Sequence, residues 1–180
     1  MERSSRNEPA KTVESWWRSM PKVIPEYEVV VSALKPVLYQ LPPKLIAIDG
    51  PNGVGKTKLG RYLSSTFNSS LVETDLFSTR PGFEYDYNCL KEIISRRLER
   101  GRPIFVEGVT VLQILDTISI DPDFHIYWKN THPSDKNLDR VGRLGVALRR
   151  YCRKYEPLRK ADLVISASID ISAAFVPAGE

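Results

Sequence analysis

Residues 50–57 constrain the fold of this chain more than any other segment. They read Gly-Pro-Asn-Gly-Val-Gly-Lys-Thr and match the pattern G-x-x-x-x-G-K-[ST] at every fixed position. The apolar run at residues 45–48 predicts a buried strand before them, and residues 58–66 carry apolar side chains at helical spacing after them. Strand, glycine-rich loop and helix together are the context in which this pattern forms a phosphate-binding loop.

The residue types of this loop suit the binding of a nucleoside triphosphate. Glycines let successive backbone N–H groups point inward as an anion nest, and the helix N-terminus adds partial positive charge. Lys56 would reach the β- and γ-phosphates, and the Thr57 hydroxyl would ligate Mg²⁺. We therefore expect ATP and Mg²⁺ as cofactors. The expected nucleotide-binding residues are Gly50, Asn52, Gly53, Val54, Gly55, Lys56, Thr57 and Lys58.

Length and composition are those of about one ordinary domain. The chain has 180 residues, of which 42% are hydrophobic, so it can bury a core. No stretch approaches the roughly 18 apolar residues of a membrane helix, and the polar N-terminus argues against a secretory signal. Two cysteines, Cys89 and Cys152, indicate reduced thiols, and neither His125 nor His132 is a catalytic candidate. We expect a cytoplasmic protein without membrane association.

Apolar strands alternate with helices after the loop. Further strands are predicted at residues 70–75, 103–108, 123–128 and 162–166, and helices at 88–100 and 111–118. This order predicts an α/β fold of three layers, α/β/α, around a five-stranded parallel sheet. Ligands of such sheets bind beyond the carboxyl ends of the strands, where Asp49, Asp75 and Glu107 fall. Asp49 is expected to stabilise the loop rather than take part in chemistry.

Residues 1–43 are predicted to form an N-terminal arm that precedes a domain at 44–180. The first residues, to about 11, are expected to be disordered, and the rest of the arm to be helical. Residues 29–34 favour one helix that ends near Pro36, although a short strand fits the same residues.

Positive charge is concentrated late in the chain, whose net charge is +4. Glu156 is the only acid among the cations Arg140, Arg143, Arg149, Arg150, Arg153, Lys154, Arg159 and Lys160. Such a run can be a solvated helix face or a nucleic-acid footprint. Beside a nucleotide loop we favour cations that close over phosphates, in a lid at about residues 129–154. Arg140 and Arg143 would share a helix face there.

Four segments carry a family resemblance: residues 46–50, 74–77, 104–109 and 155–165. The first runs into the glycine loop, the second places an acid and an aromatic residue after a strand, and the third ends a strand in Glu-Gly. The fourth has Pro157 before Ala-Asp and the last strand. In this order they resemble the P-loop kinases of small molecules, most closely the uridine kinase and phosphoribulokinase group. The resemblance spans about residues 44–166 and implies a P-loop NTPase fold with a short helical lid.

This resemblance implies transfer of the γ-phosphate of ATP to a hydroxyl of a small metabolite, with a nucleoside or sugar as the acceptor. Asp75 would accept the proton of that hydroxyl or orient it, and Glu107 would hold Mg²⁺ or contact the acceptor. For both carboxylates a helix cap is the simpler alternative. The implied catalytic residues are Lys56, Asp75, Glu107, Arg140 and Arg143. The implied acceptor contacts are Asp75, Arg80, Tyr85, Asp86 and Glu107, and the implied metal ligands are Thr57, Asp75 and Glu107.

Departures from that group leave other functions open. The loop filling Pro51-Asn52-Gly53-Val54 is not rich in Ser and Gly, and the lid segment lacks the group's Arg-Asp pair. A nucleoside monophosphate kinase is one alternative, and Arg80, Arg96 and Arg97 do not settle it. A nucleotide-binding module or ATPase associated with nucleic acid is another, and its affinity would depend on salt. The acids at two strand ends favour a kinase. A homodimer remains open.

Overall fold

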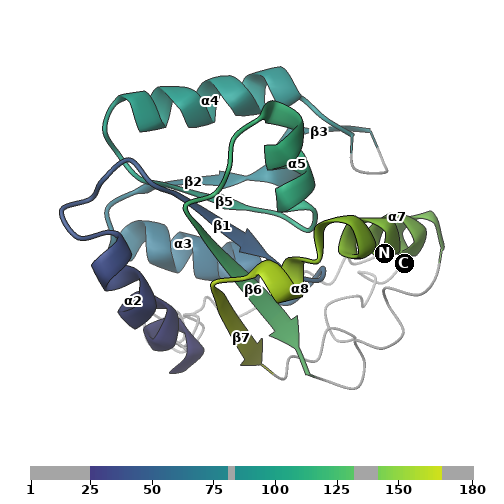
Figure 1. Cartoon of the computed structure of the whole chain (residues 1–180), viewed down its shortest axis with the longest axis horizontal. Coiled ribbons are helices and arrows are strands. Elements are labelled where there is room, and N and C mark those ends of the chain that lie inside the picture. The colour runs from purple at the N-terminus through teal and green to yellow at the C-terminus, as the bar shows by residue number, and fades with distance from the viewer. Residues whose placement is uncertain (1–24, 81–83, 132–141, 168–180) are drawn as a thin grey trace, which may run out of the picture.

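A five-stranded sheet forms the centre of the protein (Figure 1). The structure is a computed structural model that describes residues 25–80, 84–131 and 142–167. The strands are β1 (Leu45–Asp49), β2 (Ser70–Glu73), β5 (Ile104–Glu107), β6 (Phe124–Asn130) and β7 (Leu163–Ala167). They lie in the order β2-β5-β1-β6-β7, and every neighbouring pair is parallel. The predicted five-stranded parallel sheet is therefore confirmed.

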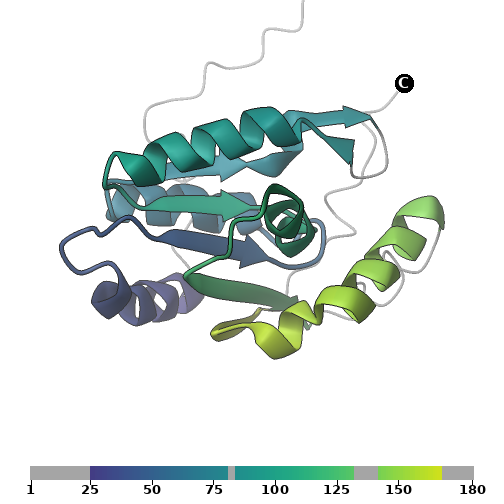
Figure 2. The same cartoon turned by 45° about the horizontal axis from the view of Figure 1, so that its top comes forward.

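Helices cover both faces of this sheet, which confirms the predicted three-layer α/β/α fold. Along the chain they are α2 (Pro25–Val37), α3 (Lys56–Thr66), α4 (Tyr87–Glu99), α5 (Val111–Ile118), α7 (Gly142–Tyr155) and α8 (Pro157–Lys160). Helices α2 and α3 pack on one face, and α4 and α5 pack on the other, as Figure 2 shows for α2 and α4. Because both faces are covered, all five residues of β1 are buried.

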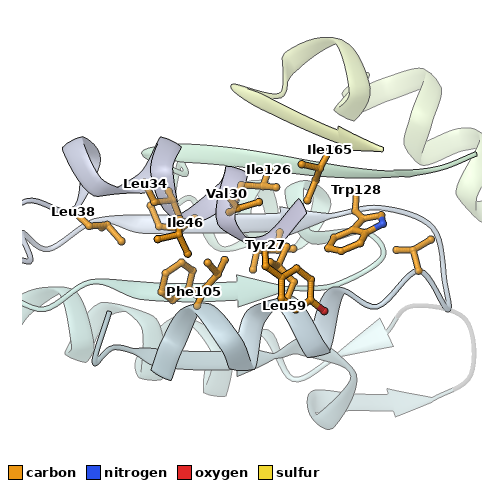
Figure 3. Close-up of a cluster of buried hydrophobic side chains, with 14 residues drawn as sticks. Tyr27, Val30, Leu34, Leu38, Ile46, Leu59, Phe105, Ile126, Trp128 and Ile165 are labelled. Atoms are coloured by element: carbon orange, nitrogen blue, oxygen red, sulfur yellow. The ribbon is translucent and has the colours of Figure 1, made fainter. Parts of the chain in front are cut away.

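The first core lies between α2, α3 and the sheet (Figure 3). Helix α2 places Tyr27, Val30 and Leu34 against Ile126 and Trp128 of β6 and their neighbours. Each fully buried aliphatic or aromatic side chain stabilises the fold by about 1.5–3 kcal/mol. The helix predicted around residues 29–34 is thus present and belongs to the main core. The division of the chain at residue 43 stays a prediction, because residues 1–24 lie outside the described part.

A second core fills the opposite face. Leu90 and Ile94 of α4 and Ile114 of α5 are fully buried against Ala47 and Val106 of the sheet. Side chains alternate along a strand, so the even-numbered residues of β1 face the first core and the odd-numbered ones face the second. By the same alternation, Asp49 at the end of β1 points to the side of α5 and α7.

The chain between β2 and α4 differs from the prediction. The predicted strand at residues 70–75 ends at Glu73, and a 3₁₀ turn, η1 (Thr74–Phe77), follows. A two-stranded antiparallel hairpin of β3 (Ser78–Arg80) and β4 (Glu84–Tyr85) occupies what was expected to be a loop. These strands are only two or three residues long, so apolar alternation gave no sign of them.

The other boundaries agree with the sequence to within about two residues. Helix α3 starts at Lys56, two residues before the expected start, and β6 runs two residues beyond the expected end, to Asn130. Gly101 has φ +68° and follows α4 in the left-handed conformation of a helix terminus, as its position suggested. None of the helices in the described ranges is long and apolar enough to cross a membrane.

Candidate active site

The glycine loop joins β1 to α3 at the carboxyl edge of the sheet. Gly50, Gly53 and Gly55 have φ values of +146°, +78° and +96°, which residues with a side chain rarely adopt. The loop can therefore turn its backbone amides inward and enter α3 at Lys56 without strain. The free N–H groups of the first helical turn face the same side, as an anion site requires.

Gly50 also lies against β6, where there is no room for a side chain. A Cβ atom built at Gly50 would lie 2.5 Å from the carbonyl oxygen of Trp128. Gly101 is a matched position, because it too has a positive φ but a Cβ there meets nothing within 4 Å.

Gly50→Ala should therefore destabilise the protein by about 3 kcal/mol, the sum of backbone strain and overpacking. Gly101→Ala should cost only the strain, about 1 kcal/mol. Urea unfolding of both variants measures the difference. Equal losses in the free energy of unfolding would show that the collision with Trp128 does not destabilise the protein.

Lys56 occupies the first position of α3 and is nearly buried, with 6% of its surface exposed. Its Nζ donates a hydrogen bond to the carbonyl oxygen of Pro51, at 2.8 Å. The ammonium group is thus held over the concave side of the loop, where the phosphates of a nucleotide would lie.

The Thr57 hydroxyl is joined to a carboxylate from another strand. Its Oγ1 donates to Oε1 of Glu107 at 2.8 Å. Glu107 ends β5, pairs in register with Ile48 of β1, and is 3% exposed. Sheet order thus brings together two groups that are 50 residues apart in sequence.

Two more carboxylates, those of Glu73 and Asp75, lie near Glu107. Glu73 lies opposite it on β2, where Arg61 of α3 binds both carboxylate oxygens, at 2.8 and 3.0 Å. Asp75 is exposed in η1. Burial raises the pKa of Glu107 most, and the charges of Asp75 and Glu73 raise it further, against the lowering effects of Thr57 and Lys56. A cation placed here would relieve this excess of negative charge.

Close approach of the strand ends depends on a second glycine. Gly108 follows Glu107, and a Cβ atom there would collide with the hydroxyl of Thr74 in η1. The Glu-Gly step at the end of β5 therefore allows η1, and with it Asp75, to pack beside Glu107.

These residues fit a magnesium ion. Mg²⁺ prefers oxygen ligands and is held by one or two carboxylates together with phosphate oxygens. The hydroxyl of Thr57 and the carboxylate of Glu107 would supply the protein ligands. No group of three or more His, Cys, Asp or Glu in the described ranges is arranged to hold a metal. Such a site would therefore need the nucleotide to complete it.

Comparison with solved structures identifies the fold. A possible uridine kinase from Bacillus stearothermophilus superposes with a TM-score of 0.56 at 18% identity, covering 78% of this chain and 97% of that chain. This chain has the P-loop kinase fold. Lower TM-scores of 0.44 are found for shikimate kinase from Acinetobacter baumannii (16% identity, 78% and 91% covered) and gluconokinase from Sinorhizobium meliloti (15% identity, 73% and 86% covered). The sequence matches no protein-family model and no curated protein.

Within this P-loop kinase fold, the structure argues against the helix-cap alternative for Asp75 and for Glu107. Asp75 lies inside η1 and does not cap α4, because the cap is Asp86, whose side chain accepts from Cys89 N at 3.0 Å. Glu107 is buried, and Thr110 precedes α5 at its N-cap. Neither carboxylate of the pair is therefore a helix cap.

The other predicted site residues are spread over the edge of the P-loop kinase fold. Val54 is buried, whereas Asn52 and Lys58 are exposed. Tyr85 belongs to the second core, and burial raises the pKa of its hydroxyl. Arg80 and Arg143 are described only by their backbone in β3 and α7, and Arg140 lies outside the described residues. The lid at 129–154 stays a prediction.

Sequence reasoning missed two participants in this region. Glu73 lies in the predicted strand at residues 70–75 and was not a candidate site residue, although its register places it beside Glu107. Tyr151 of α7 reaches Asp49 at the base of the loop. Its spacing of three residues from Leu148 places both side chains on one face of a helix, and this spacing was a signal that Tyr151 faces inward.

Proposed function

We propose that this protein is an ATP-dependent kinase that phosphorylates a hydroxyl of a small molecule. The observation that carries this proposal is the hydrogen bond from Thr57 to Glu107, at 2.8 Å. It joins the phosphate loop to a buried carboxylate on the neighbouring strand, the pair of groups that holds Mg²⁺ beside the phosphates in P-loop NTPases. The P-loop kinase fold supports the same assignment at the level of architecture.

In the proposed reaction the acceptor oxygen forms a bond to the γ-phosphorus as the bond between that phosphorus and the β–γ bridging oxygen breaks. The proton of the acceptor hydroxyl passes to the carboxylate of Asp75, and ADP leaves with the bridging oxygen. Lys56 stabilises charge on the β- and γ-phosphates throughout. Thr57 and Glu107, with Asp75 nearby, would hold Mg²⁺, which would neutralise phosphate charge.

A nucleoside or a sugar is the proposed acceptor. Asp75 is exposed at the carboxyl edge of the sheet, and the hairpin β3–β4 stands at the same edge (Figures 1 and 2). A hydroxyl delivered there would meet a carboxylate close enough to Glu107 to influence its pKa. Arg80, Tyr85 and Asp86 belong to or follow this hairpin and are the proposed acceptor contacts.

The test is a screen of ATP consumption with nucleosides, sugars and nucleoside monophosphates, using Lys56→Ala as the inactive control. A hydroxyl acceptor that raises turnover well above the hydrolysis rate supports the proposal. Stimulation by monophosphates alone would indicate transfer to a phosphate, and stimulation by RNA or DNA would indicate a nucleic-acid-associated ATPase. If no acceptor raises turnover above that with water, the kinase proposal fails.

Asp75→Asn should lower kcat with the best acceptor by about 10²–10⁴-fold, because general acid–base catalysis contributes that factor. The affinity for ATP should change little, since Asp75 is exposed and outside the phosphate loop. Steady-state kinetics and equilibrium ATP binding separate the two effects. Asp121→Asn, at an exposed acid before β6, is the matched control and should leave both unchanged. Equal losses of rate and ATP affinity would instead indicate a structural role for Asp75.

A further inference from the structure

Asp49 is a carboxylate that the proposed reaction does not use, although it directly precedes the phosphate loop. It is 1% exposed at the end of β1. Its Oδ1 accepts a hydrogen bond from the backbone N–H of Gly50 at 2.6 Å. A buried carboxylate is unfavourable unless hydrogen bonds and charges compensate for the lost water. The groups around Asp49 therefore determine whether the loop can keep this conformation.

Tyr151 of α7 supplies the second hydrogen bond. Its hydroxyl donates to Oδ2 of Asp49 and accepts from the backbone N–H of Leu112, in the first turn of α5, at 3.4 Å. The side chain is 3% exposed. Burial, followed by the nearby charge of Asp49, raises the pKa of Tyr151 far above its ordinary value, so its hydroxyl remains a donor throughout the physiological range.

His125 of β6 is the third neighbour of Asp49. Its Nε2 lies 3.6 Å from Oδ2 of Asp49, beyond hydrogen-bonding distance. Neither ring nitrogen of His125 has a hydrogen-bond partner within the described ranges. Of these two neighbours of Oδ2, the hydroxyl of Tyr151 is the one that donates a hydrogen bond.

Two side chains of α7 also border the first residues of the loop. Leu148 and Tyr151 line a cavity of about 30 Å³ together with Gly50 and Pro51. This volume is room for about two water molecules. Helix α7 and the first loop residues therefore adjoin at this cavity as well as at the hydrogen bond.

We propose that Tyr151 is a positioning residue that couples helix α7 to the phosphate-binding loop through Asp49. The inference rests on the nucleotide binding assigned under the proposed function. Tyr151 holds Asp49, Asp49 holds the N–H of Gly50, and the turn at Gly50 directs the later loop amides toward the phosphates. Because the coupling is reciprocal, a bound nucleotide also holds α7, most of which lies within the predicted lid segment at 129–154.

Tyr151→Phe is the direct test, with Tyr155→Phe as the matched control. Tyr155 lies one turn later on α7, stacks on Tyr151 with ring centroids 5.3 Å apart, and also donates to a carboxylate, that of Asp116, at 2.7 Å. Its hydroxyl does not contact the loop. We expect Tyr151→Phe to weaken binding of Mg²⁺–ATP about tenfold in calorimetry, the effect of one hydrogen bond to a charged group, and Tyr155→Phe to leave it unchanged.

A double-mutant cycle distinguishes positioning from general destabilisation. In an Asp49→Asn background the oxygen that accepts from Tyr151 is replaced or lost, so Tyr151→Phe should then change ATP affinity by less than twofold. Unfolding free energies measured on the same variants show whether loss of stability follows the loss of affinity. Additive effects of the two substitutions on ATP affinity would overturn the proposal.

Hydrogen exchange on the wild-type chain tests the coupling even if Tyr151→Phe does not fold. Addition of ATP should slow exchange of backbone amides in residues 148–155, which lie at the end of the predicted lid and outside the expected nucleotide-binding residues of the phosphate loop. Unchanged exchange there, while the loop becomes protected, would overturn the inference and leave the proposed function intact. If the wild type binds no nucleotide at all, both proposals fail.

Discussion

Lys56→Ala is expected to lower the rate of phosphoryl transfer by about 10³-fold, the effect of removing one preorganised charge from the transition state. The side chain is nearly buried and is held by the loop carbonyl of Pro51, so its charge is already in place before the nucleotide arrives. Little reorganisation is needed during the reaction, which makes a fixed charge effective. Rapid-quench measurement of single-turnover transfer would give the chemical step separately from product release.

The matched control for Lys56→Ala is Lys58→Ala. Lys58 lies two residues later on α3 and is exposed, so its charge is screened by water. Its expected contact with the nucleotide is through the backbone N–H of the first helical turn, which Lys58→Ala keeps. This substitution should change the rate by less than about threefold, because exposed single charges contribute little. A comparable loss from both substitutions would show that net charge near the loop, rather than the placement of Lys56, determines the rate.

Glu107→Gln is expected to abolish most activity and yet to stabilise the fold. The amide can still accept a hydrogen bond from Thr57, but it has no charge to offer Mg²⁺, and we expect kcat to fall by about 10²–10³-fold. Stability at neutral pH should rise by about 1 kcal/mol, as is common when a strained functional group is removed. Activity assays and urea unfolding of the same preparation measure the two effects.

The pH dependence of that stabilisation has a defined sign. Burial and the neighbouring acids raise the pKa of Glu107 in the folded state, so the folded chain holds this proton more tightly than the unfolded chain does. The ionised group therefore destabilises the fold at neutral pH. This destabilisation shrinks as the pH falls through the raised pKa of the folded chain and is gone below the pKa of the unfolded chain. The stability difference between Glu107→Gln and the wild type should shrink to nothing on acidification.

Glu73→Gln provides the contrast to Glu107→Gln. Glu73 faces Glu107 across the sheet but forms an ion pair with Arg61. Its substitution should lower stability by less than about 1 kcal/mol, the usual range for an exposed pair. If Glu107→Gln lowered stability by a similar amount, the buried carboxylate would stabilise the fold, and the prediction that it lowers the free energy of unfolding would be wrong.

Most of the sheet could be predicted because its signals are local. A buried parallel strand needs a run of apolar residues, such as Ile104–Val106. In the glycine loop, the glycines themselves mark the positions where the backbone adopts a positive φ. The hairpin β3–β4 could not be predicted, since two short strands depend on contacts with η1 and α4 rather than on periodicity.

The sequence alone determined the donor side of this site. The loop from Gly50 to Thr57 specifies a backbone curve, a cation and a hydroxyl within eight consecutive residues, so local geometry suffices to predict a phosphate site. Only the tertiary structure decided which distant groups meet that loop. The strand order placed Glu107 beside Thr57, and the packing of α7 placed Tyr151 on Asp49. The family resemblance implied the first pairing, and helical spacing indicated only that Tyr151 faces inward. The partners themselves depend on which strands and helices become neighbours when two hydrophobic faces of one sheet are buried.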